Sequence, residues 1–163
     1  MTNNKATNGA GIYTDGDSAT NKNAIVNIHR STISNNEASN AAIYVMYAIV
    51  KIQDTIISEN DCTSNGGGLY LSSSDVTLQN NIFSKNKARH GGGIDIGPFS
   101  TIVIRKCSFN DNDASINGDD IFAFHGPTIS IINTVINASK IYEDTSANSI
   151  TWQTCANSPC SVA

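Results

Sequence analysis

The sequence predicts an all-β fold: a right-handed single-stranded parallel β-helix with three short strands in each coil of about 25 residues and about five to six coils. Three observations lead to this prediction. The 163-residue chain is polar, with only 15% charged residues, yet 39% of its residues are hydrophobic. Its apolar residues recur in short stripes at a nearly constant interval. Each stripe alternates like a strand and is too short for a helix.

The repeat contains three stripes separated by polar corners. A corner of small residues, mostly glycine, opens the first stripe, and the third stripe ends in a large apolar residue. Successive copies of that residue lie 24, 26, 26 and 27 positions apart. The first stripes occupy 9–13, 41–45, 66–71, 91–96 and 118–123, the second stripes 25–28, 49–52, 76–78, 102–104 and 129–131, and the third stripes end at Ile33, Ile57, Phe83, Phe109 and Ile136.

Alternation within each stripe separates an inner face from an outer face. Ile94 and Ile96, then Ile102 and Ile104, fall on one side of their stripes, whereas Asp95 falls on the other. Each strand is expected to pair with its copy one coil away, at about 4.8 Å. The right hand follows from the general chirality of parallel crossovers.

The corner after the third stripe carries a recurring asparagine. It stands three residues beyond the apolar anchor, and a small residue follows two positions later. Stacked side-chain amides can bond to one another and to the backbone, which satisfies polar groups that a buried corner would otherwise leave unpaired. We therefore predict an internal asparagine ladder, with a structural role, formed by Asn4, Asn36, Asn60, Asn86 and Asn112.

These paired signatures resemble the repeats of the chlamydial polymorphic outer-membrane proteins. Residues 66–69 and 91–94 read Gly-Gly-Gly followed by an aliphatic residue, with the third glycine where that family usually has alanine. Residues 83–86 and 109–112 read Phe-x-x-Asn. The resemblance extends from residue 4 to about residue 139. It implies a right-handed β-helix of the pectin-lyase type that is displayed outside the cell, often for adhesion.

The first coil contains an irregular insertion. Ile12 and Ile28 are 16 residues apart, whereas the equivalent residues of later coils are 9 or 10 apart. Insertions in solenoids project from one face and can bind partners. Asp15 and Asp17 lie here and make the insertion a candidate partner loop. A plain solvated loop is the favoured interpretation, and a Ca²⁺ contact is disfavoured because the other features of an EF-hand loop are missing.

One acidic pair suggests an alternative function. Asp119 and Asp120, followed by His125 and Gly126, resemble the Asp-Asp and His-Gly elements of polygalacturonases. Inverting glycoside hydrolysis needs two carboxyl groups about 6.5–9.5 Å apart, and neighbouring strand residues face opposite sides. The family's third aspartate and its Arg-x-Lys have no counterpart. We therefore favour a structural role for the pair at the corner of the last regular coil.

The regular repeats are expected to cover residues 1–141, starting inside a coil, and residues 142–163 to form an irregular cap or linker. Cys155 and Cys160 in that segment are a candidate disulfide, whereas Cys62 and Cys107 are expected to be buried free thiols. Asn137, in an Asn-x-Ser sequon, is a candidate N-glycosylation site.

Composition limits the function classes. A net charge of −4 argues against nucleic acid as a partner, and no apolar run is long enough for membrane insertion. We expect no cofactor, no metal and no catalytic residue. The predicted function is that of a non-enzymatic extracellular or cell-surface β-helix, acting as a stalk, a filament or sheath subunit, or an adhesin segment. It would associate end to end with its own copies or with neighbouring repeats, or bind cell-surface glycans or proteins. A carbohydrate-active enzyme and a glycan-binding solenoid are the alternatives.

Overall fold

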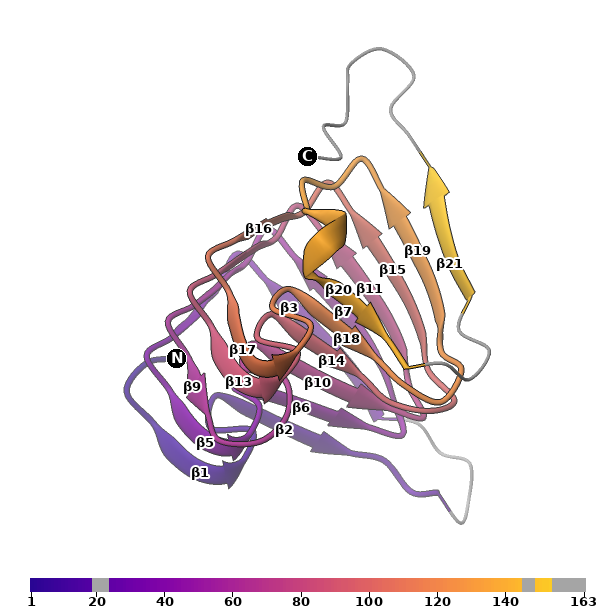
Figure 1. Cartoon of the computed structure of the whole chain (residues 1–163). Coiled ribbons are helices and arrows are strands. Elements are labelled where there is room, and N and C mark those ends of the chain that lie inside the picture. The colour runs from indigo at the N-terminus through magenta and orange to yellow at the C-terminus, as the bar shows by residue number, and fades with distance from the viewer. Residues whose placement is uncertain (19–23, 145–148, 154–163) are drawn as a thin grey trace.

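The protein forms a stack of parallel coils (Figure 1). The computed structural model describes residues 1–18, 24–144 and 149–153. Each regular coil contributes one strand to each of four parallel sheets, which we number I to IV in the order in which the chain passes through them. Every strand inside a sheet therefore pairs with the strands of the coils before and after it, so that the sheets run along the axis of the stack.

Sheet I contains β1 (Lys5–Asn8), β5 (Glu37–Asn40), β9 (Asp61–Cys62), β13 (Lys87–His90) and β17 (Asp113–Asn117). Sheet II contains β2 (Ile12–Asp15), β6 (Ile43–Met46), β10 (Leu69–Ser72), β14 (Ile94–Ile96), β18 (Ile121–Ala123) and β20 (Ile141–Glu143). Sheet III contains β3 (Ala24–His29), β7 (Ala48–Gln53), β11 (Asp75–Gln79), β15 (Thr101–Arg105), β19 (Thr128–Ile132) and β21 (Ser149–Gln153). Sheet IV contains β4 (Thr32–Ser34), β8 (Ile56–Ser58), β12 (Ile82–Ser84) and β16 (Ser108–Asn110), and one 3₁₀ turn, η1, spans Ala138–Lys140.

The all-β parallel solenoid predicted from the stripes is confirmed, and the three stripes become sheets II, III and IV. Sheet I is a fourth strand position in the coil, where the sequence predicts only a corner. Strands β5, β9 and β13 bury one small inward residue each, and β1 and β17 bury none, so sheet I carries no apolar stripe. Strand pairing also continues past residue 141, because β20 pairs with β18 and β21 pairs with β19.

Most corners of the coil contain one residue in the left-handed backbone region, and the corner after β18 contains two, His125 and Gly126. This conformation bends the chain sharply, so that it can leave one sheet and enter the next within a few residues. Glycine adopts it freely, whereas other residues are strained there. The corners after sheet IV use Asn3, Asn35, Glu59, Lys85 and Asp111; those after sheet I use Gly9, Ala41, Gly66, Gly91 and Gly118; those after sheet II use Tyr47, Ser73, Phe99 and His125; and those after sheet III use Arg30, Asp54, Asn80, Lys106 and Asn133.

The glycine-rich corners also bring consecutive coils into close contact. A β-carbon on Gly67 would lie 2.4 Å from the carbonyl oxygen of Gly92 in the next coil. A β-carbon on Gly92 would in turn lie 2.5 Å from the carbonyl oxygen of Asp119. These distances leave no room for a side chain, so the glycine repeats are required by packing.

The core is a narrow column of aliphatic residues enclosed by the four sheets. Ile33, Ile57 and Phe83 are fully buried one above another, and the Phe83 ring stacks on Phe109 with centroids 5.0 Å apart. Burial of each such side chain contributes about 1.5–3 kcal/mol. Identical positions in successive coils thus stabilise one another. Within the described residues, no helix is long and apolar enough to cross a membrane.

Candidate functional site

The predicted asparagine ladder is confirmed. The side-chain Nδ2 of Asn36 donates to Oδ1 of Asn60 at 2.9 Å, and Asn60 donates in the same way to Asn86 at 2.8 Å. In Asn36, Asn60, Asn86 and Asn112 the Oδ1 also accepts a backbone N–H from the previous coil, and the Nδ2 also donates to a backbone carbonyl, as Asn86 does to Ile57. Asn4 begins the described ladder and Asn112 continues it. The amides are therefore saturated by structural bonds.

The ladder ends on an acid. Nδ2 of Asn112 donates to Oδ1 of Asp120 at 2.9 Å, and Asp120 is only 1% exposed. Burial raises the pKa of Asp120, while the bond from Asn112 and the nearby Lys140 oppose that rise. Its neighbour Asp119 accepts the backbone N–H of Ala114 and lies 3.7 Å from the Lys140 ammonium. Both carboxyl groups that suggested glycoside hydrolysis thus bond to the scaffold.

A second polar stack, which the sequence prediction did not include, lines the corner between sheets III and IV. The Thr55 backbone N–H donates to Oδ1 of Asn81 at 3.0 Å, and the Cys107 N–H donates to Oγ1 of Thr134. A signal for it exists in the sequence, because a small or polar residue stands two positions before each sheet IV anchor. The residues at this position are Ser31, Thr55, Asn81, Cys107 and Thr134.

The cysteines of the coils are buried free thiols, as expected. Cys62 packs under sheet I, where other coils have alanine, and burial raises its pKa to about 12. Burial raises the pKa of Cys107 to about 11. Cys155 and Cys160, the candidate disulfide, lie outside the described residues.

The remaining predicted site residues lie at the surface. Asn137 caps η1, with its Oδ1 accepting from the backbone N–H and the hydroxyl of Ser139. Asp15 belongs to strand β2 and not to the insertion, and its carboxylate accepts from the Tyr13 hydroxyl at 3.2 Å. Asp17 follows it, and residues 19–23 of the insertion are outside the described part of the chain. No group of three His, Cys, Asp or Glu side chains in the described ranges is arranged to hold a metal.

The outer face of sheet II carries the most distinctive surface of the molecule. The same outward position in successive strands holds an aromatic residue in every strand but one. We call this set the aromatic column. It consists of Tyr13, Tyr44, Tyr70, Phe122 and Tyr142, with Asp95 between Tyr70 and Phe122.

The rings of the aromatic column stack along the axis. Centroids of Tyr13 and Tyr44 are 5.4 Å apart, those of Tyr44 and Tyr70 are 4.9 Å apart, and those of Phe122 and Tyr142 are 5.6 Å apart. Because neighbouring rings lie nearly parallel, their edges form two outward bands, one on each side of Asp95. Tyr13 is 52% exposed at one end and Tyr142 is 42% exposed at the other.

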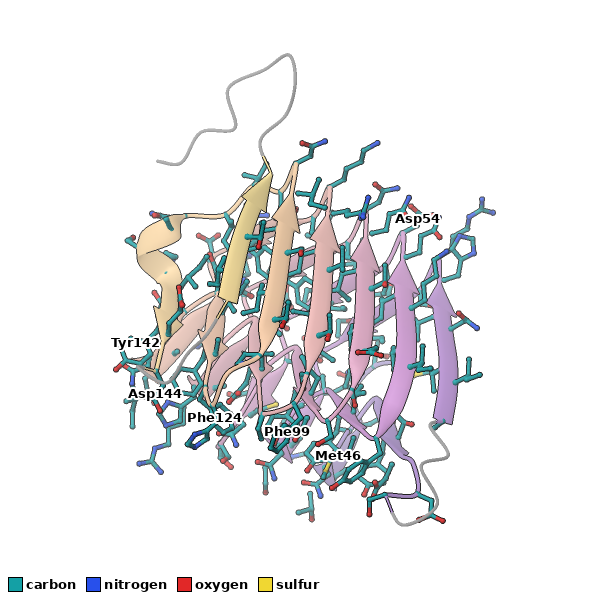
Figure 2. All side chains as sticks on the ribbon, turned by 90° about the vertical axis from the view of Figure 1, so that its right-hand side faces the viewer. Met46, Asp54, Phe99, Phe124, Tyr142 and Asp144 are labelled. Carbon is teal, nitrogen blue, oxygen red and sulfur yellow. The ribbon has the colours of Figure 1, made fainter. Side chains whose placement is uncertain are left out.

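Further apolar side chains extend this surface toward sheet III. Figure 2 shows Met46, Phe99, Phe124 and Tyr142 along one edge of the stack, with Asp54 at the opposite edge. Phe99 is 86% exposed at its corner, and Phe124 packs against Phe122 with centroids 5.6 Å apart. An exposed aromatic band of this kind is typical of an interaction surface.

Burial raises the pKa of ionisable side chains within the column. Burial raises the pKa of Tyr44 to about 12, with smaller effects from Tyr70, Tyr13 and Asp15. Burial alone raises the pKa of Asp95 to about 8. The pKa of His90, whose ring lies 4.9 Å from Phe122, is lowered by burial and by Arg89. The column thus presents an aromatic, hydroxyl-bearing and largely uncharged surface.

Comparison with protein families gives one match, described as right-handed β-helix region, over residues 1–157. The chain belongs to the right-handed β-helix family. Its coils are therefore right-handed, as predicted. Searches among curated proteins and among solved structures find no match. The family assignment fixes the architecture of this β-helix, and the features specific to the polymorphic outer-membrane proteins stay a resemblance.

Proposed function

We propose that this β-helix is a non-enzymatic scaffold at the cell surface or outside the cell, and that it binds glycans along the aromatic column. The observation that supports the proposal is the register of Tyr13, Tyr44 and Tyr70 on one outer face. Ligand sites combine apolar and aromatic surface with a few polar groups that orient the ligand. Aromatic edges bearing hydroxyl groups supply both, and they repeat along the axis as the units of a linear glycan do.

The non-enzymatic part of the proposal draws on the bonds made by the acidic pair. Asp119 accepts a hydrogen bond from the backbone N–H of Ala114, and Asp120 accepts one from the last asparagine of the ladder, Asn112. A general acid or base must instead reach the substrate. An extracellular location is consistent with the low charge and with the resemblance to surface-displayed repeats.

Affinity electrophoresis in gels containing xyloglucan, glucomannan or galactan tests the proposal. We expect at least one neutral polysaccharide to retard the purified chain. Tyr13→Ala and Tyr142→Ala should each weaken that retardation, by about tenfold or more if the ring is a main contact. Ile49→Ala, on the exposed face of sheet III, is the matched control and should have no effect.

Two results would contradict the proposal. Equal retardation of the tyrosine variants and the wild type would exclude the aromatic column as the site. Release of sugar fragments during the assay, abolished by Asp120→Asn, would favour the carbohydrate-active enzyme.

End-to-end self-association stays a separate prediction for the same scaffold. Ile12 and Val26 of the first coil are only partly buried, whereas their equivalents Ile43 and Val50 in the next coil are 0% and 2% exposed. Another coil stacked on the first would bury them further. Light scattering at increasing protein concentration should then show a rising mass, and a constant monomer mass would exclude self-association.

A further inference from the structure

The aromatic column is broken once, at Asp95. Strand pairing places Asp95 directly between Tyr70 and Phe122, on the same outward face as both rings. An outward aspartate would normally be solvated, yet Asp95 is only 1% exposed. A carboxyl group is therefore held inside an aromatic surface, where burial without hydrogen bonds is costly.

Two polar atoms at this break have no hydrogen-bond partner among the described residues. They are Oδ1 of Asp95 and Nδ1 of His90, and both atoms are buried. Both side chains adjoin Phe122, since the His90 ring lies 4.9 Å from its ring and Asp95 is its neighbour in the sheet. Unpaired buried polar atoms are rare in folded proteins, and two around one aromatic ring point to a site that can bind a polar group.

The local charges favour a neutral ligand over a cation. The pKa of Asp95 is about 8, so its carboxyl is mainly protonated at pH 7 and can both donate and accept. Neutral His90 donates or accepts through Nδ1, depending on its tautomer. Arg89, which lowers the pKa of His90, adds a positive charge nearby that would oppose a bound cation. A hydroxyl group, which also donates and accepts, matches both atoms.

We infer that Asp95 and His90 form a polar subsite within the aromatic column, and that this subsite takes a hydroxyl group of a neutral sugar unit between Tyr70 and Phe122. The inference rests on the proposed glycan-binding function and identifies the position on the column that selects the sugar. Tyr70 and Phe122 flank Asp95 and are themselves partly exposed, so a change of their rotamers would admit the ligand.

Two substitutions at Asp95 test the subsite with the neutral polysaccharide that the wild type binds best. Asp95→Leu keeps the approximate size and removes both polar atoms, and should weaken binding about tenfold or more. Asp95→Asn keeps one donor and one acceptor and should bind within about threefold of the wild type. Circular dichroism and urea unfolding of each variant show whether the fold is retained.

A second measurement reports on His90 directly. The chain contains three histidines, so ¹⁵N-labelled imidazole signals can be assigned by substitution. Addition of a short oligosaccharide from the same polymer should shift the Nδ1 signal of His90. The signal of His29, which pairs with Asp54 at the opposite edge of the sheets, should not move.

The outcomes separate this inference from the proposed function. Weaker binding by Tyr13→Ala together with unchanged binding by folded Asp95→Leu would overturn the subsite and leave the glycan-binding column standing. An unmoved His90 signal at saturating oligosaccharide would also overturn it. Absence of binding to every polysaccharide would overturn the column and the subsite together.

Discussion

Asn112 and Asp120 meet at the point where the asparagine ladder ends, with Nδ2 of Asn112 donating to Oδ1 of Asp120 at 2.9 Å. Asp120 does not occupy the ladder position of its coil. It stands at the corner where earlier coils have Gly68 and Gly93, while the expected ladder position holds Ser139. The acid thus supplies the acceptor that the next asparagine would have supplied.

We predict that Asp120→Asn leaves stability nearly unchanged, because its amide oxygen can still accept from Asn112. Asp120→Ala should lower the free energy of unfolding by about 1–3 kcal/mol, because it leaves a buried amide donor unpaired. Urea unfolding followed by circular dichroism measures both. Asp113→Ala, an exposed change in the same coil, is the control. Equal stability of Asp120→Ala and the wild type would show that the bond is not structural.

Removal of an asparagine from the middle of the ladder should lower the free energy of unfolding by more than Asp120→Ala does. Asn86 donates to Asn112 and Ile57 and accepts from the side chain and backbone of Asn60. Asn86→Ala should therefore destabilise the chain by about 2–4 kcal/mol. Asn110→Ala, at an exposed position of sheet IV, should change stability by less than about 0.5 kcal/mol. A similar loss for both variants would contradict the ladder as a specific source of stability.

Asp95 should make stability depend on pH. Its folded pKa of about 8 lies above the ordinary value of 3.8, so the folded state holds the proton more tightly than the unfolded state. The contribution of Asp95 is fully present below about pH 4 and is lost as the pH rises through about 8. Asp95→Asn should thus be more stable than the wild type by about 2 kcal/mol or more at pH 9, with a smaller difference at pH 4. Urea midpoints across this range measure the trend, and a constant difference would contradict it.

Replacing a non-glycine residue at a left-handed corner with glycine should stabilise the protein. Lys106 has a φ of 51° and an exposed side chain, so Lys106→Gly should relieve backbone strain at little cost in contacts. We expect a gain of about 0.5–1 kcal/mol in thermal or urea unfolding. Arg105→Gly, one residue earlier in strand β15, should instead destabilise the chain by a similar amount. A loss of stability in both variants would contradict the strain at Lys106.

Much of the fold can be predicted from the sequence because the spacing of the repeats determines which residues of successive coils pair. The spacing of Ile33, Ile57 and Phe83 places identical positions above one another, and both the core column and the asparagine ladder follow. Sheet I does not follow, because strands such as β9 bury only one small residue. Such strands lack the alternating hydrophobic residues from which a strand is predicted.

The candidate site could be predicted only in part. Tyr13, Tyr44 and Tyr70 each directly follow the Ile or Leu that begins their sheet II strand, so their alignment is visible in the sequence once the register is known. The burial of Asp95 is not visible, since it depends on how the neighbouring rings lie over an outward carboxyl group. The contact of Asp120 with Asn112 is hidden for a similar reason, because it joins two different corner positions across a coil.

The pairing of each strand with its copy in the next coil also determines how the protein responds to force. Hydrogen bonds between coils point along the axis, so tension applied along that axis acts in full on every interface, and the weakest interface separates first. A coil should then peel away as a unit, releasing a length of chain set by the repeat. A load across the axis is instead shared among many coils at once. We therefore expect the stack to separate at a lower force when it is pulled lengthwise than when it is loaded across the axis.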